Sequence, residues 1–157
     1  MATFRIVTVI AAPREVCFDL ARDIDFHVRS LADTGERAVA GRTAGLIGLG
    51  ESVTWEARHL GVRQRLTSEV TAFDRPAYFR DVMTAGAFRA FAHDHRFEAT
   101  GGGTVMTDEV AFRSPLGPLG WLVDAMFLTG YLRRLLGGRC QAIKREAESY
   151  QAGVQKA

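Results

Sequence analysis

Apolar and polar residues alternate along most of residues 36–112, and this period of two constrains the fold more than any other feature. In residues 51–59, Val53, Trp55 and Ala57 occupy alternate positions, with polar residues between them. Successive side chains of a β-strand point to opposite faces of a sheet, so this segment is predicted to be a half-buried strand. Turn residues separate it from similar segments at residues 62–73, 78–83, 88–97 and 104–112. Short turns between such segments favour an antiparallel sheet of hairpin-linked strands.

The two ends of the chain add a further strand and the helices. Residues 3–10 alternate in the same way and predict a first strand, and Pro13 begins one or two short helices that extend to about residue 31. After Ser114 the apolar spacing becomes helical and continues to about residue 151. This order predicts an α+β fold in which a curved antiparallel sheet of about seven strands grips a long C-terminal helix, with two short helices after the first strand.

Composition limits the class of protein. The 157 residues carry 20 basic and 18 acidic side chains, and the formal charge of +2 is too small for a domain that binds nucleic acid by neutralising phosphates. This length is typical of one domain, so residues 1–157 are expected to form a single unit. Two cysteines make no disulfide framework and no leader is evident, which predicts a cytoplasmic protein. Charged residues interrupt the most apolar stretch, residues 116–136, so no transmembrane span is predicted.

Four segments of the chain resemble one known family. They are residues 12–20, 50–59, 79–83 and 93–97, which read APREVCFDL, GESVTWEARH, FRDVM and HDHRF. With the order of the elements, they make the chain similar to the SRPBCC superfamily over roughly residues 3–150. That superfamily includes START lipid-transfer domains, birch-pollen-allergen-like proteins and polyketide cyclases. The resemblance implies a single START-like ligand-binding domain with the helix-grip fold and a deep, largely apolar cavity between sheet and helix. No cofactor is predicted from the sequence.

Five titratable side chains share faces with apolar ones in the predicted strands: His59, Asp81, His93, His95 and Asp108. If these faces point inward, all five groups lie in the interior. An unpartnered buried polar group costs roughly 1–3 kcal/mol, whereas a whole domain is stable by only about 5–15 kcal/mol. The five groups must therefore pair with one another or face a cavity that holds water or a ligand.

Two interpretations of this cluster are open. In the first, the histidines and aspartates form a structural network that ties neighbouring strands together. In the second, they orient the polar head of an apolar ligand, and His93 or His95 acts as an acid or base while Asp81 or Asp108 holds a tautomer. His93 and His95 are therefore the catalytic candidates. The predicted ligand-binding residues are Trp55, His59, Asp81, Met83, Phe91, His93, His95, Asp108, Phe112 and Met126.

The His93-x-His95 spacing also raises the question of a metal site. Zinc needs three or four nitrogen, sulfur or oxygen ligands, so His59 or an aspartate would have to complete the set. The spacing alone is weak, no cysteine lies near it in the sequence, and the superfamily is not generally built on a metal. From the sequence we therefore predict no metal site.

Three other features are predicted to carry no chemistry. The glycine-rich residues 45–50 lead into a strand, whereas a phosphate-binding motif leads into a helix, so they predict a hairpin or a lid at the cavity rim. Cys17 and Cys140 lie in helical segments without a neighbouring base and are predicted to be small core or surface residues. The apolar residues 121–131 are predicted to pack against the sheet, with transient membrane docking as the alternative.

The leading functional hypothesis is a cytoplasmic protein that binds or carries a small hydrophobic ligand, such as a lipid, a quinone or a polyketide-like aromatic. An aromatic interior with a few convergent polar groups is typical of such a site. The first alternative is an enzyme resembling polyketide cyclases and dehydrases that uses pocket His and Asp groups as acid and base. The second alternative is a protein-interaction module that uses the outer face of the sheet or residues 131–136.

Overall fold

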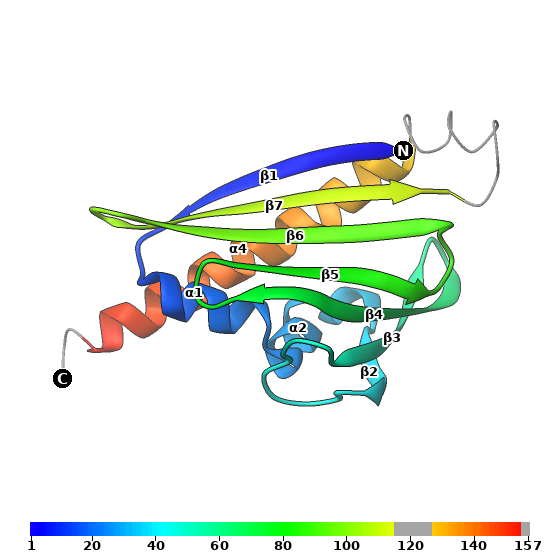
Figure 1. Ribbon diagram of the computed structural model, residues 1–157, viewed down its shortest axis with the longest axis horizontal. Coiled ribbons are helices and arrows are strands. Elements are labelled where there is room, and N and C mark those ends of the chain that lie inside the picture. The colour runs from blue at the N-terminus through cyan, green and yellow to red at the C-terminus, as the bar shows by residue number, and fades with distance from the viewer. Residues whose placement is uncertain (115–126, 155–157) are drawn as a thin grey trace.

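A computed structural model describes residues 1–114 and 127–154 of the chain. Its central feature is a seven-stranded antiparallel sheet in which neighbouring strands follow the order β1-β7-β6-β5-β4-β3-β2 (Figure 1). The strands are β1 Ala2–Ile10, β2 Arg37–Gly41, β3 Ser52–His59, β4 Val62–Asp74, β5 Tyr78–Ala85, β6 Ala90–Thr100 and β7 Gly103–Arg113. The helices of the described residues are α1 Arg14–Ala21, α2 Ile24–Ser30 and α4 Thr129–Val154, with a short 3₁₀ helix at Ala32–Thr34.

This arrangement confirms the predicted α+β helix-grip fold, with its seven strands, two short helices and long C-terminal helix. Consecutive strands from β2 to β7 pair with each other, and those from β3 to β7 are joined by the short turns that the sequence predicted. The first strand instead pairs with the last, from Ala2 opposite Phe112 to Ile10 opposite Thr104, which no local pattern could show. The helix predicted for residues 115–126 lies outside the described residues.

Helix α4 lies across one face of the sheet and runs diagonally behind the strands in the view of Figure 1. Helices α1 and α2 both pack against it. Two hydrogen bonds fix α4 to the end of β1: Lys144 Nζ donates to the Val9 carbonyl at 2.7 Å, and Glu148 Oε1 accepts from the Ala11 N–H at 2.9 Å. Among the described helices, none combines the length and hydrophobicity needed to span a bilayer.

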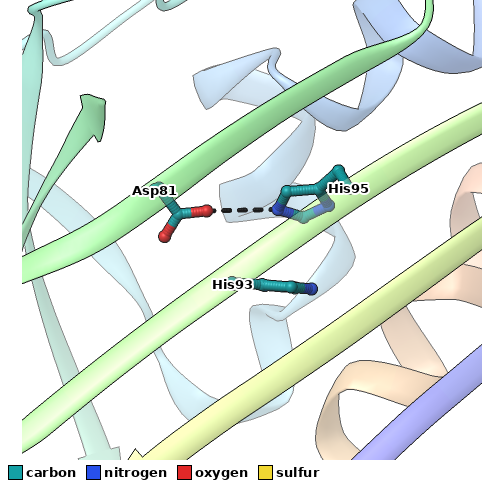
Figure 2. A group of neighbouring side chains, drawn as sticks. All are labelled: Asp81, His93 and His95. Carbon is teal, nitrogen blue, oxygen red and sulfur yellow. Dashed lines mark hydrogen bonds and ion pairs between the residues drawn. The ribbon is translucent and has the colours of Figure 1, made fainter. Parts of the chain in front are cut away.

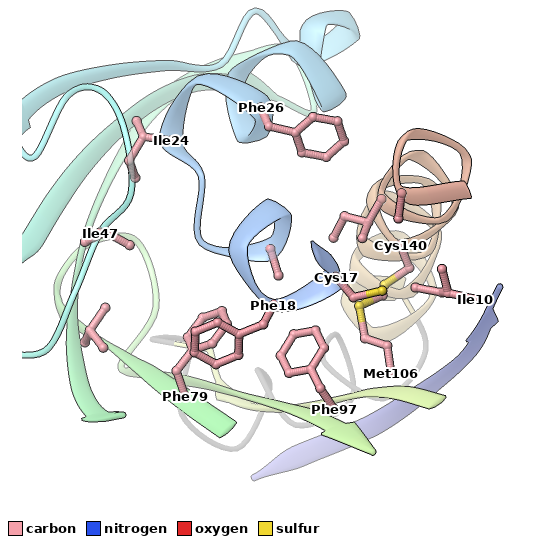
Figure 3. Packing of buried hydrophobic residues seen from close by; sticks show 14 of the residues in the cluster. Ile10, Cys17, Phe18, Ile24, Phe26, Ile47, Phe79, Phe97, Met106 and Cys140 are labelled. Atoms are coloured by element: carbon pink, nitrogen blue, oxygen red, sulfur yellow. The ribbon is translucent and has the colours of Figure 1, made fainter. Parts of the chain in front are cut away.

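The larger apolar cluster of the core is centred on Phe18 of α1 (Figure 3). Its ring meets the rings of Phe73, Phe79 and Phe97 edge to face, with centroids 5.3–5.4 Å apart. Burying one such side chain stabilises the fold by about 1.5–3 kcal/mol. A second cluster joins β1, β7 and α4 through Phe4, Val110, Phe112 and Leu132. Residues of both clusters border the cavity that α4 closes against the sheet.

Candidate functional site

A cavity of about 190 Å³ lies between the inner face of the sheet and helices α2 and α4. Most of its wall is apolar and comes from side chains such as Ile47, Val53, Leu66, Val70 and Leu135. The titratable side chains in the wall include His27, Glu36, His59, Asp81, His93, His95 and Arg139. An apolar cavity with a few convergent polar groups is the usual form of a small-molecule site.

Six of the predicted ligand-binding residues line this cavity: Trp55, His59, Asp81, Phe91, His93 and His95. Asp108 lies behind them and contacts two of the histidines. Met126 is outside the described residues.

Two predicted residues, Met83 and Phe112, are not part of the described cavity wall. The Phe112 side chain is fully buried in the second apolar cluster, and Phe88, which does line the cavity, packs on its ring with centroids 5.8 Å apart. The Met83 sulfur lies beside Gly86, just beyond the end of β5. The period of two gave the correct face of the sheet for both residues. The Phe88 ring separates Phe112 from the cavity, and Met83 lies near the end of its strand.

Strand register explains why four of the predicted titratable groups meet. Asp81 on β5 lies directly opposite His93 on β6, and His95 lies directly opposite Asp108 on β7. The hydrogen bonds run along the diagonals between these pairs, which long or aromatic side chains can reach. His93 Nε2 donates to Asp108 Oδ1 at 2.9 Å, and His95 Nε2 lies 3.1 Å from Asp81 Oδ2 (Figure 2).

Asp108 is the centre of this network, and its side chain is fully buried. Its Oδ1 also lies 2.9 Å from His95 Nδ1, an ionic contact in which the N–H does not point at the oxygen. Its Oδ2 accepts a hydrogen bond from Cys140 Sγ of α4 at 3.3 Å. Four of the five inward-facing groups thus pair with one another, and the fifth, His59, pairs through Nδ1 with the Tyr131 hydroxyl at 2.8 Å. We call Asp81, His93, His95 and Asp108 the inner network.

Burial and pairing distribute the protons of the inner network unequally. Burial opposes ionisation of Asp108, but the hydrogen bond with His93 and the close contact with His95 outweigh it and hold the pKa of the carboxyl far below its usual range. Burial also opposes a charge on His95, yet its contacts with Asp108 and Asp81 raise its pKa. Burial and the neighbouring His95 lower the pKa of His93. The arrangement therefore favours one imidazolium, on His95, between two carboxylates.

A second polar group in the cavity wall is one that the sequence analysis missed. His27 of α2 pairs through Nε2 with Glu36 Oε1 at 3.0 Å, and its ring stacks on Trp55 with centroids 4.0 Å apart. Arg139 of α4 is 3% exposed; its Nη2 donates to the Ala21 carbonyl, and its Nε has no hydrogen-bond partner in the described structure. His27, Glu36 and Arg139 all lie outside the described strands, where side-chain alternation does not indicate which groups face inward.

A sequence signal for Arg139 does exist. Leu132, Leu136, Arg139 and Ile143 recur at helical spacing, and a charge within such an apolar stripe indicates an inward-facing polar group. The same stripe corrects another expectation. Tyr131, Leu132, Leu135 and Leu136 all line the cavity, so the segment considered as a partner-binding surface turns inward.

The glycine-rich segment and the two cysteines make contacts that serve the fold. The glycine-rich residues 45–50 lie at the cavity rim, where Ile47 forms part of the wall and its N–H donates to the Arg22 carbonyl at 3.1 Å. Cys17 and Cys140 are both buried free thiols, and burial raises the pKa of each. Only the thiolate is a strong nucleophile, so neither cysteine is suited to nucleophilic chemistry.

Comparison with known proteins is consistent with this architecture. The family model described as polyketide cyclase / dehydrase and lipid transport matches residues 1–148. The chain belongs to this family. Its membership confirms the resemblance to the SRPBCC superfamily and supports a fold that binds hydrophobic ligands. A search among curated proteins gives no significant match.

Several solved structures share the fold. Protein TTHA0849 from Thermus thermophilus matches with a TM-score of 0.71 at 20% identity, over 90% of this chain and 97% of that one. A START superfamily protein from Mycobacterium smegmatis has a TM-score of 0.71 at 13% identity, over 94% and 98%. Ginseng major latex-like protein 151 from Panax ginseng has a TM-score of 0.68 at 16% identity, over 93% and 97%. At these identities the likeness shows the fold alone.

Proposed function

We propose that this family member binds one small, mostly apolar ligand in the cavity, with a single polar group of the ligand directed at the inner network. The observation that carries the proposal is the cavity itself, whose apolar wall ends in the half-buried Asp81 and the buried His93 and His95 side chains. A cavity of about 150 Å³ is large enough to bind benzene. The volume of about 190 Å³ therefore suits a one-ring phenol or quinone, or a short acyl chain, without displacement of the wall.

Asp81 is the group best placed to hold the polar end of the ligand. One of its carboxylate oxygens contacts His95 Nε2, and its side chain is 22% exposed towards the cavity. Within the described residues the other oxygen has no protein donor, so it can accept a hydrogen bond from a ligand hydroxyl. Burial opposes ionisation of Asp81, but contacts with His95 and His93 lower its pKa and keep it an acceptor.

A ligand screen tests the proposal directly. Protein purified from its own host is examined by native mass spectrometry and solvent extraction, and phenols, quinones and short acyl compounds are screened by thermal unfolding. At a concentration about 100 times its Kd, a ligand raises Tm by roughly 5–10 °C. No bound molecule and no stabilising compound in either assay would contradict the proposal.

A cavity-filling variant shows where the ligand binds. Ala57 is buried and lines the cavity, so Ala57→Leu fills part of the space and should abolish the ligand-induced rise in Tm while the protein stays folded. Val7→Leu is the matched control. Val7 is 54% exposed on the outside of the sheet, so this substitution introduces a leucine away from the cavity. A ligand effect that survives Ala57→Leu would place binding elsewhere.

A second candidate function is acid–base catalysis of the cyclase and dehydrase type, which the His95–Asp81 pair at the cavity wall favours. In a dehydration, the Asp81 carboxylate would accept the proton from carbon while His95 protonates the departing hydroxyl, which leaves as water. His93→Ala and His95→Ala should then abolish turnover of a β-hydroxy ketone and leave folding and ligand affinity largely intact. Equal loss of folding in both variants would indicate a structural network instead.

We also propose that the protein acts in the cytoplasm and without a nucleic acid partner. Both cysteines are free and buried, as expected where thiols stay reduced, and the formal charge is only +2. Fractionation of host cells with an antibody against the protein tests the location.

A further inference from the structure

We propose that Asp81, His93 and His95 bind one divalent metal ion of the zinc class at the polar wall of the cavity. One ligand atom from each residue lies within 4.8 Å of the others (Figure 2). Two imidazoles and one carboxylate are a donor set that zinc uses in sites with an open coordination position. The sequence spacing predicted no metal because it showed only the two histidines, whereas the strand register adds Asp81 beside them.

The hydrogen bonds of the two imidazoles are those of metal-binding histidines. His93 Nε2 faces the ionised Asp108 carboxylate and must therefore carry a proton, so Nδ1 carries the lone pair that can bind a metal. His95 Nδ1 faces the same carboxylate, which leaves Nε2 for the metal. A histidine that binds a metal usually donates its other N–H to a carboxylate. Asp108 accepts such a bond from His93, and it lies 2.9 Å from His95 Nδ1 in an ionic contact. The Cys140 thiol, which donates to the second oxygen of Asp108, holds that carboxylate in place.

The distance between two of the proposed ligands suits a shared ion. His95 Nε2 and Asp81 Oδ2 are 3.1 Å apart. Zinc binds nitrogen and oxygen at about 2.0–2.2 Å, so two ligands at a tetrahedral angle lie roughly 3.4 Å apart. An increase of a few tenths of an ångström, which side-chain rotation can supply, would let the ion replace the proton between these two atoms.

The carboxylates around the cavity outnumber the guanidiniums. Asp23, Glu36 and Asp81 line the wall and Asp108 lies behind it, against Arg22, Arg65 and Arg139, which gives a formal sum of −1 with neutral histidines. A cation at the inner network therefore meets surroundings of net negative charge.

Binding of an apolar ligand does not require the metal, so the two proposals are tested apart. The full chain is stripped with a chelator and titrated with zinc by calorimetry and with Co²⁺ by visible absorption. We expect one zinc ion per chain and an increase in Tm. With Co²⁺ we expect the intense visible bands of a four-coordinate ion that is bound in part by imidazole nitrogen. A folded protein that gives no such bands and no zinc-dependent increase in Tm would overturn the metal site, whatever the result of the ligand screen.

Variants locate the ion. Asp81→Asn and His95→Gln should each weaken zinc binding by at least roughly a hundredfold, and Asp108→Asn by roughly 10–100-fold, the usual effect of losing an outer hydrogen-bond partner. Asp94→Asn is the matched control, because it removes a carboxylate from the opposite face of β6, where Asp94 contacts Tyr78 and Arg80, and should leave zinc affinity unchanged. If Asp81→Asn folds and binds zinc as tightly as the wild type, the ion binds elsewhere and the proposal is wrong. If a variant does not fold, the Co²⁺ spectrum of the wild-type protein still shows whether imidazole nitrogen binds the ion.

Discussion

Each face of the sheet carries a carboxylate with a very low exposed fraction, Asp108 on the inner face and Glu56 on the outer face, but different kinds of partner cover them. Asp108 on the inner face is fully buried among His93, His95 and the Cys140 thiol. Glu56 on the outer face of β3 is 6% exposed. What covers Glu56, however, is a group of arginines whose own side chains are 64–77% exposed, so water and salt reach every pair.

Strand register builds the outer group as it builds the inner one. Glu56 lies directly opposite Arg37 on β2 and Arg65 on β4. Arg37 Nη2 and Arg65 Nε donate to its two oxygens at 2.6 and 2.9 Å, and these hydrogen bonds lower the pKa of the carboxyl. We call Glu56 with Arg37, Arg63 and Arg65 the outer network. Two carboxylates with similarly low exposed fractions therefore differ in their surroundings: Asp108 contacts buried partners, whereas Glu56 lies under solvent-exposed arginine side chains.

The largest effect is expected from Asp108→Ala. The change leaves His95 charged or unpaired in a dry interior and removes the acceptor of Cys140, so unfolding free energy should fall by about 3–5 kcal/mol in urea titrations. Glu109→Ala is the control on the same strand; Glu109 is 45% exposed and its loss should cost less than about 0.5 kcal/mol. Similar losses for the two variants would remove the distinction between inner and outer carboxylates.

A smaller effect tests whether α4 contributes to the inner network. Cys140→Ala and Cys17→Ala remove the same atoms from two buried positions, but only the Cys140 thiol donates to a carboxylate. Cys140→Ala should therefore destabilise the protein by about 1 kcal/mol more than Cys17→Ala, measured by the urea midpoint at constant m-value. Equal destabilisation would show that the thiol only fills space.

The outer network should be sensitive to salt. Glu56→Gln removes a charge that exposed arginines surround, so the variant should unfold at a slightly lower urea concentration than wild type in dilute buffer, and the difference should vanish at about 1 M salt. Asp108→Asn provides the contrast, because its partners are shielded from solvent and its deficit should persist at high salt. A deficit of Glu56→Gln that salt does not reduce would mean that this carboxylate is buried in the same sense as Asp108.

The pH dependence of the same variant gives the smallest effect. The pKa of Glu56 is lowered in the folded protein, so its contribution to stability is complete above about pH 4.3, the ordinary glutamate value, and disappears as pH falls through the lower folded value. In thermal unfolding at low salt, wild type and Glu56→Gln should therefore differ at pH 7 and converge as the pH falls through the lowered folded-state pKa of Glu56. If the two proteins instead converged as the pH was raised, the pKa of Glu56 would be higher in the folded protein than in the unfolded one.

Much of this architecture could be predicted, because side-chain alternation is a local property of the chain. The period of two identified the strands and the inward direction of His59, Asp81, His93 and His95. The cost of burying polar groups then required that they pair, and they do. The partners could not be predicted, since the hydrogen bonds follow diagonals that only the register of β5, β6 and β7 creates.

The rest of the site depends on contacts made outside the strands. Glu36 pairs with His27 of α2, nine residues earlier in the chain, and Arg139 reaches the Ala21 carbonyl from α4, over a separation of 118 residues. The alternation of side chains along a strand does not reveal such pairs. Phe112 shows the opposite error, because it faces inward but the ring of Phe88 covers it.

By itself, the sequence determined which residues form strands and which side of the sheet each side chain faces, because both follow from the local geometry of an extended chain. It also determined the long amphipathic helix that closes the sheet. Only the tertiary structure decided that β1 pairs with β7, that Asp108 serves two histidines and a thiol, and that Asp81 stands within reach of both imidazoles. Those outcomes depend on strand register and on where α4 lies, and both are set by packing of the whole core.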